Sequence, residues 1–284
     1  GPWATTARME TLRSPKELTG PALGLPALTF RAWFEAQFGL PAWNALDKIP
    51  RLQWMDYLRW YRQVLRLDVR NRQRLQSVQP RADGVVQLDM VDESEGAART
   101  YRVLARHVVL ATGRDGLGGP WVPDWVHDLP RTHWAHSAHD WSGESLHGKQ
   151  VAVVGGGASA MDAAATALEN GAARVDLLIR RSELPRINKG KGAGNPGMAH
   201  GFGALPDEWK WRFRHYINVQ QVPPPQGSTL RVSRHANAFF HLGAGVRGAS
   251  LRKDGRLRLE TAKGPIAADF VIFCTGFRTD WSQR

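Results

Sequence analysis

The sequence predicts an α/β fold, and three consecutive segments carry this prediction. Residues 150–154 form the apolar run that is typical of a buried parallel strand. A glycine turn follows, and then an alanine-rich stretch over residues 158–168 predicts a helix that ends at Asn170-Gly171. A second apolar run, residues 175–179, ends in two arginines. This order of strand, glycine turn, helix and strand is the βαβ unit of a Rossmann-like, three-layer dinucleotide-binding domain.

The glycine turn supplies the residues that we expect to contact the dinucleotide. Gly155 makes the tight turn, Gly157 lets the backbone approach a pyrophosphate, and Ala160 allows the helix to pack close to the strand. The free N–H groups and the dipole of the first helical turn favour phosphate, so the predicted contacts are Gly155, Gly156, Gly157, Ala158, Ser159 and Ala160. The same pattern is also compatible with a glycine turn that binds no ligand.

Arg180 and Arg181 stand at the end of the second strand, where a site for NAD would place an acidic residue. Guanidinium groups suit phosphate oxygens, so these arginines predict a 2′-phosphate and therefore NADP(H) as the cofactor. The alternative is ordinary surface charge, since the chain carries a formal net charge of +12.

Upstream of this unit, the spacing of apolar residues predicts helices over residues 28–38 and 51–67. In the second helix we expect one buried face made by Leu52, Met55, Leu58 and Leu65. A β-meander is predicted next, and residues 107–111 are expected to form a further buried strand; the meander strands are residues 74–78, 85–91 and 100–103.

Downstream, residues 184–203 are rich in glycine and lysine and predict a loop near the cofactor phosphates. A helix is expected over residues 207–218, and residues 246–251 and 257–261 predict a second meander. Residues 270–273 predict the last buried strand.

Two strands end in the same kind of turn, Thr112-Gly113 before the dinucleotide unit and Thr275-Gly276 after it. A small turn of this type lets the chain leave a strand next to a flat ligand or pass into another domain. Each turn alone favours an independent strand end, but the placement of both around one βαβ unit argues against coincidence.

With these features the sequence resembles the flavin-containing monooxygenase-like group of FAD- and NADPH-dependent oxidoreductases, which includes Baeyer–Villiger and N-hydroxylating enzymes. In that group an NADPH domain interrupts an FAD domain, and Thr112-Gly113 and Thr275-Gly276 are similar to its two crossovers. Gly1-Pro2-Trp3 is similar to the tryptophan motif that follows the FAD glycine motif, and His136-Ser137 to part of the family fingerprint, although Pro130 and Thr132 depart from it.

The resemblance implies a role in FAD binding for Trp3, for both Thr-Gly turns, and for Arg13 and Ser14, where animal-type members carry an asparagine. It implies a partial FAD-binding domain over residues 1–118, an NAD(P)-binding domain with its entry linker over 119–276, and the return to the FAD domain over 277–284. We expect a fragment that lacks the N-terminal FAD glycine motif and the C-terminal FAD segment.

The implied reaction is a monooxygenation, in which NADPH reduces FAD and one oxygen atom of O₂ passes through a flavin C4a-(hydro)peroxide to a small organic substrate. No acid–base pair is assigned, so the catalytic residues stay unknown. Two alternatives are open: an FAD/NAD(P)H reductase that inserts no oxygen, and a truncated NADP(H)-binding fragment without activity.

Bulk properties narrow the classes of partner. The arginines form no dense run, so we expect no nucleic acid, and no apolar stretch approaches the ~18 residues that span a bilayer. Cys274 is the single cysteine, which excludes an internal disulfide and predicts a reducing, cytoplasmic location. His133, His136 and His139 lack the spacing of a zinc site, so no metal is expected. A homodimer is compatible with the sequence.

Overall fold

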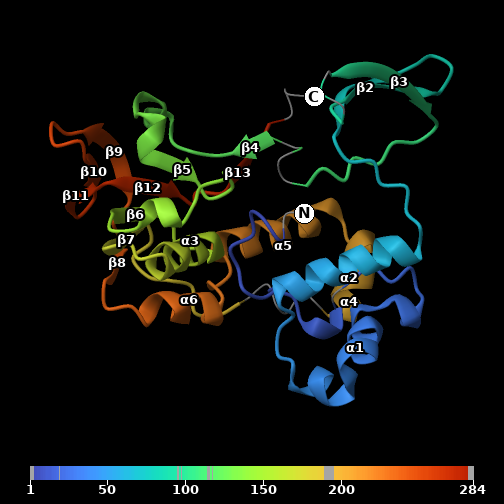
Figure 1. Cartoon of the computed structure of the whole chain (residues 1–284), viewed down its shortest axis with the longest axis horizontal. Coiled ribbons are helices and arrows are strands. Elements are labelled where there is room, and N and C mark those ends of the chain that lie inside the picture. Colours follow the sequence, from blue (N-terminus) through green and yellow to red (C-terminus); the bar gives the residue numbers. More distant parts are fainter. Residues whose placement is uncertain are drawn as a thin grey trace.

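The structure is a computed structural model, and it describes residues 3–18, 20–94, 96, 98–113, 116, 118–188 and 195–280. Figure 1 shows a parallel sheet with its helices on one side of the molecule. The helices α1 and α2 and the meander with β2 and β3 lie on the other side. The α/β fold predicted from the sequence is confirmed.

The central sheet has five parallel strands in the order β5-β12-β6-β7-β8. Their bounds are β5 Trp134–His136, β12 Phe270–Phe273, β6 Gln150–Val154, β7 Arg174–Ile179 and β8 Ala238–Leu242. The strands predicted over 150–154, 175–179 and 270–273 are therefore confirmed. Because β6 lies in the middle, the turn that follows it opens at the centre of the carboxyl edge, where α/β sheets bind their ligands.

Side chains of the sheet alternate between two cores. Val151, Val153 and Leu177 pack under α3 (Ala158–Glu169) and α6 (Gln226–Ser233), against a row of buried alanines of α3. On the opposite face, Ala152, Leu178, Val271 and Phe273 pack against the antiparallel meander of β9 (Val246–Leu251), β10 (Leu257–Thr261) and β11 (Gly264–Ala268). Helices, sheet and meander make the three layers that the sequence predicts.

A separate aromatic core holds α1 (Phe30–Ala45) and α2 (Arg51–Val64) together. Thr29 caps α1 by accepting a hydrogen bond from the N–H of Ala32, and the helix continues past its predicted end through a kink at Gly39, whose φ is +82°. The predicted apolar face of α2 is confirmed only in part. Leu58 and Leu65 pack against the aromatic core, but Leu52 is 53% exposed, and the buried residues are Trp54, Tyr57 and Tyr61. Aromatic rings bury more area than leucine does, so they decide which face packs inward.

The first predicted meander is confirmed as the antiparallel sheet of β1 (Gln73–Pro80), β2 (Val86–Asp92) and β3 (Arg99–Ala105). The buried strand predicted over residues 107–111 is wrong, because this segment forms no strand and Val109 is 88% exposed. An apolar run becomes a buried strand only where a neighbouring strand pairs with it, and none of the described residues does so here.

The chain enters and leaves the sheet region through one two-stranded ribbon, in which β4 (Gly118–Pro120) pairs antiparallel with β13 (Phe277–Thr279). This pairing places the entry of the chain into the sheet region beside its exit (Figure 1). We call the entry, residues 118–121, the first connection, and the exit, residues 274–279, the second connection. The domain bounds at 118, 119, 276 and 277 stay a prediction.

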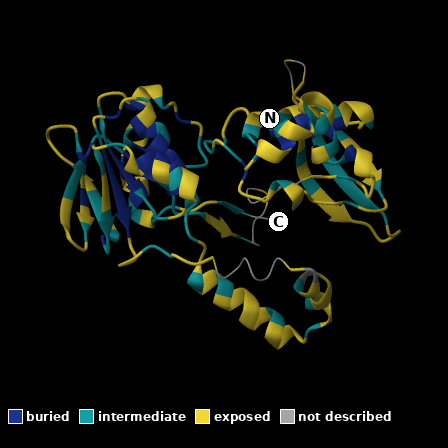
Figure 2. Ribbon diagram, turned by 90° about the horizontal axis from the view of Figure 1, so that it is seen from below, coloured by how far each residue is buried: buried dark blue, intermediate teal, exposed yellow. Residues whose placement is uncertain are grey.

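Two further helices follow β7. The loop predicted over residues 184–203 is partly wrong, because α4 (Pro196–Gly201) lies within it; residues 189–194 lie outside the described residues. The predicted helix over 207–218 is confirmed as α5 (Asp207–Gln220), which buries none of its residues (Figure 2). No helix among the described residues combines the length and apolar character that a membrane span needs.

Candidate functional site

The glycine turn between β6 and α3 has the form that a bound anion requires. Gly155 has a φ of +141°, and Gly156 approaches Ile179 so closely that a Cβ would lie 2.9 Å from its Cγ2 atom. Around Gly157, in contrast, a Cβ would meet no atom within 4 Å. Gly157 precedes α3, which has no side-chain cap, so the N–H groups of Ala158 and Ser159 have no intrahelical acceptor. The turn therefore presents open space and free donors to a phosphate.

The remaining predicted residues of this turn have distinct surroundings. Ala160 is fully buried under the sheet, as its place in the motif requires. The carbonyl oxygen of Ser159 lies 3.5 Å from Sγ of Cys274, and burial raises the pKa of that thiol to about 12. Cys274 is thus a neutral packing residue of the second connection, close to the start of α3.

Arg180 and Arg181 lie directly after β7, at the same edge of the sheet as the glycine turn, and both are exposed. Nη2 of Arg181 donates to the carbonyl oxygen of Val219 at the end of α5, 3.0 Å away, and the Arg181 carbonyl accepts from the N–H of Gly243. The stem of Arg180 passes beside Gly245. Both guanidinium groups thus belong to the sheet edge at which the sequence predicts them. Their contact with a 2′-phosphate stays a prediction.

The second Thr-Gly turn is tied to the first connection. The N–H of Trp121 donates to the carbonyl oxygen of Gly276 at 2.9 Å, and the hydroxyl of Thr275 donates to the carbonyl oxygen of Trp121. Thr112 and Gly113 are exposed, with φ of +66° at Gly113. The Thr275-Gly276 turn therefore helps to join the two connections.

His136, from the partial fingerprint, lies on β5 and is fully buried. Its Nδ1 accepts a hydrogen bond from the N–H of Ala138 at 3.1 Å, and its ring meets Phe277 edge to face. These contacts give His136 a structural place beside the second connection. Among the described residues, no three His, Cys, Asp or Glu side chains are grouped as a metal site would need.

The N-terminal segment, residues 3–14, contacts α3 and α6. Trp3 packs against the aromatic core of α1 and α2, and Arg51 of α2 donates to its carbonyl oxygen. Farther on, the guanidinium of Arg8 stacks 3.5 Å above the ring of Trp141, while Ser14 is exposed. This segment therefore connects the aromatic core with the dinucleotide sheet.

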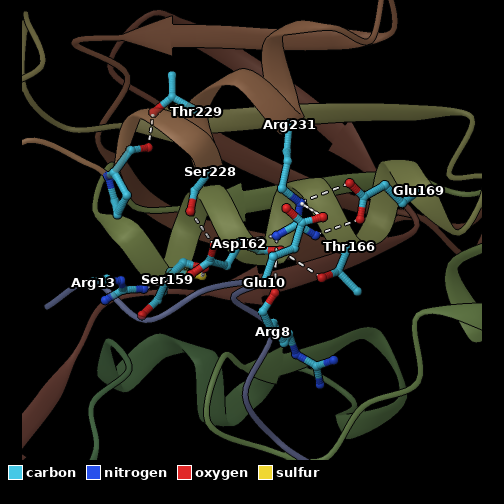
Figure 3. Close-up of polar contacts among 12 residues, drawn as sticks. Arg8, Glu10, Arg13, Ser159, Asp162, Thr166, Glu169, Ser228, Thr229 and Arg231 are labelled. Atoms are coloured by element: carbon cyan, nitrogen blue, oxygen red, sulfur yellow. Dashed lines mark hydrogen bonds and ion pairs between the residues drawn. The ribbon is translucent and has the colours of Figure 1, made fainter. Parts of the chain in front are cut away.

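Arg13 binds α3 through Asp162, a carboxylate that is only 3% exposed (Figure 3). Nη2 of Arg13 donates to one oxygen of Asp162 at 2.7 Å, and the hydroxyl of Ser228 on α6 donates to the other at 2.6 Å. A buried carboxylate needs such partners, because its desolvation is otherwise costly. Sequence reasoning placed Arg13 at the flavin, and nothing local in the sequence could have indicated Asp162 as its partner.

A second part of this network surrounds Arg231 of α6, which is 8% exposed. Its Nε and Nη2 atoms donate to the two oxygens of Glu169 at 3.0 and 2.6 Å, and Glu10 of the N-terminal segment lies 3.5 Å away. The hydrogen bonds from Arg231 hold the pKa of Glu169 below its usual value. The ion pairs therefore fasten the N-terminal segment, α3 and α6 to one another (Figure 3).

A pocket of about 970 Å³ opens beside this network. Its wall comes from five places in the sequence: residues 10–13, residues 45–48 at the end of α1 and just after it, Ala158 at the start of α3, Asn188, and the segment from Val222 to Arg231. The volume is typical of a pocket for a small molecule or cofactor. Sequence reasoning missed it, because its lining residues share no motif.

The fold and the glycine turn together define an α/β protein of the dinucleotide-binding type. A family model described as L-lysine 6-monooxygenase/L-ornithine 5-monooxygenase matches residues 42–208, which is more than half of the chain. The chain therefore belongs to the L-lysine 6-monooxygenase/L-ornithine 5-monooxygenase family. The resemblance expected from the sequence, to the flavin-containing monooxygenase-like group that includes the N-hydroxylating enzymes, is confirmed.

Relatives of the chain are longer than the chain itself. The FAD-dependent urate hydroxylase of Xanthomonas campestris pv. campestris is 43% identical over 283 residues, which are 99% of this chain and 58% of that protein. The L-lysine N6-monooxygenase of Escherichia coli is 24% identical over 267 residues, 84% of this chain and 59% of that protein. The chain spans less than two thirds of both relatives.

The likeness extends to solved structures. The FAD-bound cadaverine monooxygenase of Erwinia amylovora superposes with a TM-score of 0.76 at 15% identity, over 97% of this chain and 69% of that one. At this identity the match shows the shared fold, and the chemistry of this chain has to be argued from its own residues.

Proposed function

We propose that this chain is the dinucleotide-binding part of a monooxygenase that uses FAD and NADPH. The observation that carries the proposal is the open glycine turn at the centre of the parallel sheet, with Arg180 and Arg181 at the same edge. NADPH supplies hydride when it is bound there. In this assignment Gly155 to Ala160 hold the pyrophosphate, and the two guanidinium groups hold the 2′-phosphate.

The flavin site is assigned to the side of the molecule where the N-terminal segment and the two connections lie. FAD, when bound, supplies the reduced flavin that activates molecular oxygen. The residues assigned to it are Trp3, Arg13, Ser14, Thr112, Gly113, Thr275 and Gly276. The exposed turn at Gly113, with its positive φ, leaves backbone accessible to a flat ligand, which supports the assignment.

For the organic substrate we favour urate, because the relative that is 43% identical over 99% of this chain is named as a urate hydroxylase. The second candidate is N-hydroxylation of a primary amine, which the family and the E. coli lysine monooxygenase support at lower identity. The protein's part in either reaction is to bind, orient and exclude water, and no acid–base pair is assigned.

The test combines one spectroscopic and one chemical measurement. The purified chain is mixed with FAD and freed of unbound flavin, and the visible flavin absorbance that remains is recorded. NADPH consumption, H₂O₂ and oxygenated product are then measured with urate and, separately, with L-lysine. We expect retained flavin and urate-dependent NADPH consumption with a product that has gained one oxygen atom.

Other outcomes separate the alternatives. Stoichiometric H₂O₂ without an oxygenated product would indicate a reductase. A colourless chain that still binds NADP⁺ would indicate a fragment without activity. Turnover with L-lysine but not with urate would show that the substrate is a primary amine and not urate.

A homodimer and a cytoplasmic location also belong to this proposal. α5 leaves Trp209, Trp211 and Tyr216 exposed, which supports an interface between copies of the chain. The single cysteine supports a reducing compartment. Sedimentation of the purified chain at several concentrations tests the dimer, and fluorescence microscopy of the tagged protein tests the location.

A further inference from the structure

We infer that the pocket beside α3 binds the organic substrate, and that it recognises this substrate as an anion through Arg13 and Lys48. The inference rests on the proposed function, because it names the substrate class of that enzyme. The pocket shares Ala158 with the nucleotide turn, and the rest of its lining belongs to other segments. A ligand held there lies next to a bound dinucleotide without occupying its phosphate site.

Lys48 supplies the first of two positive charges that a ligand in the pocket can contact. It is half-buried, and it forms no ion pair or hydrogen bond with any residue that the structure describes. Its neighbour Asp47 and the other lining carboxylate, Glu10, are both exposed, so water solvates their charges at the rim. A half-buried ammonium group without a carboxylate partner favours an anionic ligand.

Arg13 supplies the second cation. Only its Nη2 atom is engaged by Asp162, and its side chain remains 42% exposed at the pocket wall. A guanidinium group has five N–H donors, so several stay available to a ligand. Asp162 is held in turn by Ser228, which fixes the place of Arg13. Asp162 is therefore a positioning residue, which acts on the ligand through Arg13.

The other polar side chains of the pocket narrow the class of substrate. Asn188 and Gln226 line it, and each carries an amide that both donates and accepts hydrogen bonds. A planar anion with alternating carbonyl and N–H groups, such as urate, matches two cations and two amides. A substrate whose reacting end is an ammonium group would meet repulsion from Arg13 and Lys48.

Equilibrium dialysis with urate tests the inference without turnover. The chain, saturated with FAD and NADP⁺, is dialysed against urate, and NADP⁺ affinity is measured separately. We expect Lys48→Gln and Arg13→Gln each to weaken urate binding by about ten- to a hundredfold, and Lys48→Arg to retain most of it. NADP⁺ affinity should stay within about twofold, since neither side chain is assigned to NADP(H). Retained flavin is recorded for each variant, because Arg13 is also assigned to the FAD site, and a loss of urate affinity counts only where the flavin is retained.

A matched control is Lys253→Gln, which removes the same charge from an exposed turn between β9 and β10 and should leave urate binding unchanged. In the wild-type background, Asp162→Asn should weaken urate binding. In the Arg13→Gln background the same substitution should add little, because Asp162 acts on urate only through Arg13. A merely structural role of Asp162 would weaken urate binding equally in both backgrounds. Thermal melting verifies that each variant folds.

Three results would overturn the inference: no urate binding to the folded wild-type chain, equal urate affinity in Lys48→Gln, or a loss of NADP⁺ affinity that matches the loss for urate. Each is independent of whether oxygen is transferred. Failure of the proposed monooxygenase reaction is therefore distinguishable from failure of this site.

Discussion

Gly155 lies so close to Cys274 that a Cβ at position 155 would stand 2.7 Å from the Cys274 carbonyl oxygen. Gly155 begins the glycine turn, and Cys274 directly follows the strand β12, which leads into the second connection. The N–H of Cys274 also donates to the carbonyl oxygen of Val154 at 2.8 Å. The backbone of the glycine turn is thus packed directly against the backbone of the segment that leaves the central sheet toward β13.

Replacing Gly155 by alanine should destabilise the chain by about 2 to 4 kcal/mol, because φ of +141° disfavours a side chain and the new Cβ would collide with backbone. Urea unfolding measures this cost. The matched variant is Gly157→Ala, where the Cβ meets open space and only helix capping is affected, at about 1 kcal/mol or less. Gly157→Ala should instead lose NADP⁺ affinity. Equal stability of the two variants would contradict this account.

Replacing both Arg180 and Arg181 by glutamine should weaken NADP⁺ binding by about 1.5 to 3 kcal/mol, the usual contribution of charge-assisted hydrogen bonds. NAD⁺ affinity should stay nearly constant, because NAD⁺ lacks the 2′-phosphate. Titration calorimetry with both nucleotides measures the difference. The double variant Arg99→Gln/Arg102→Gln, on the exposed strand β3, controls for the loss of two positive charges. An equal loss for both nucleotides would argue against a 2′-phosphate site.

Glu169 should contribute to stability in a pH-dependent way. Its pKa is held low in the folded chain by the Arg231 hydrogen bonds, so its contribution is present above its unfolded pKa and is lost as pH falls through the folded value. Glu169→Gln should cost about 2 kcal/mol near pH 7, and the difference from wild type should shrink below a pH of about 4.

Urea unfolding at neutral and acidic pH measures this effect. Glu260→Gln, which loses an exposed pair with Arg258, is the control and should change stability little at either pH. A constant difference between wild type and Glu169→Gln across the acid range would refute the linkage.

Tyr57 should make the chain sensitive to alkali. Burial, with a smaller contribution from Tyr61, raises its pKa to about 12. Because the folded pKa lies above the unfolded value, the stabilising contribution is complete below a pH of about 10 and is lost as pH rises toward the folded value. Tyr57→Phe should remove this dependence. At neutral pH it should cost about 1 kcal/mol, since the carbonyl oxygens of Pro21 and Leu28 lose their donor.

Denaturant unfolding at pH values on both sides of the Tyr57 transition tests the prediction. Tyr216→Phe is the control, because Tyr216 is 50% exposed on α5. A wild type that loses no more stability in alkali than Tyr57→Phe would show that Tyr57 titrates normally.

Local patterns were sufficient to predict the elements around the nucleotide turn. β6 is recognised by its apolar run, the turn by its glycines and α3 by its alanines. All three signals lie within about twenty consecutive residues, so no distant contact is needed to predict them. Strands β8 and β11 were not predicted: β8 is partly exposed at the edge of the sheet, and β11 begins with Gly264-Pro265. Edge strands show weak hydrophobic alternation and carry residues that central strands exclude.

The pocket could not be predicted for a different reason. Arg13, Lys48 and Ser228 come together only when three segments pack, and each alone is an ordinary polar residue. The segment over residues 107–111, in contrast, was predicted as a strand that the structure does not contain. Its apolar pattern is that of a buried strand, but burial depends on a partner strand that the pattern cannot supply.

The ribbon of β4 and β13 gives the intervening residues the topology of a closed loop on a short stem. Pro120 and Phe277 face each other in register in this ribbon, so the two ends of the segment between them are adjacent in space. A short peptide could therefore join these two ends without altering the path of any strand within the segment.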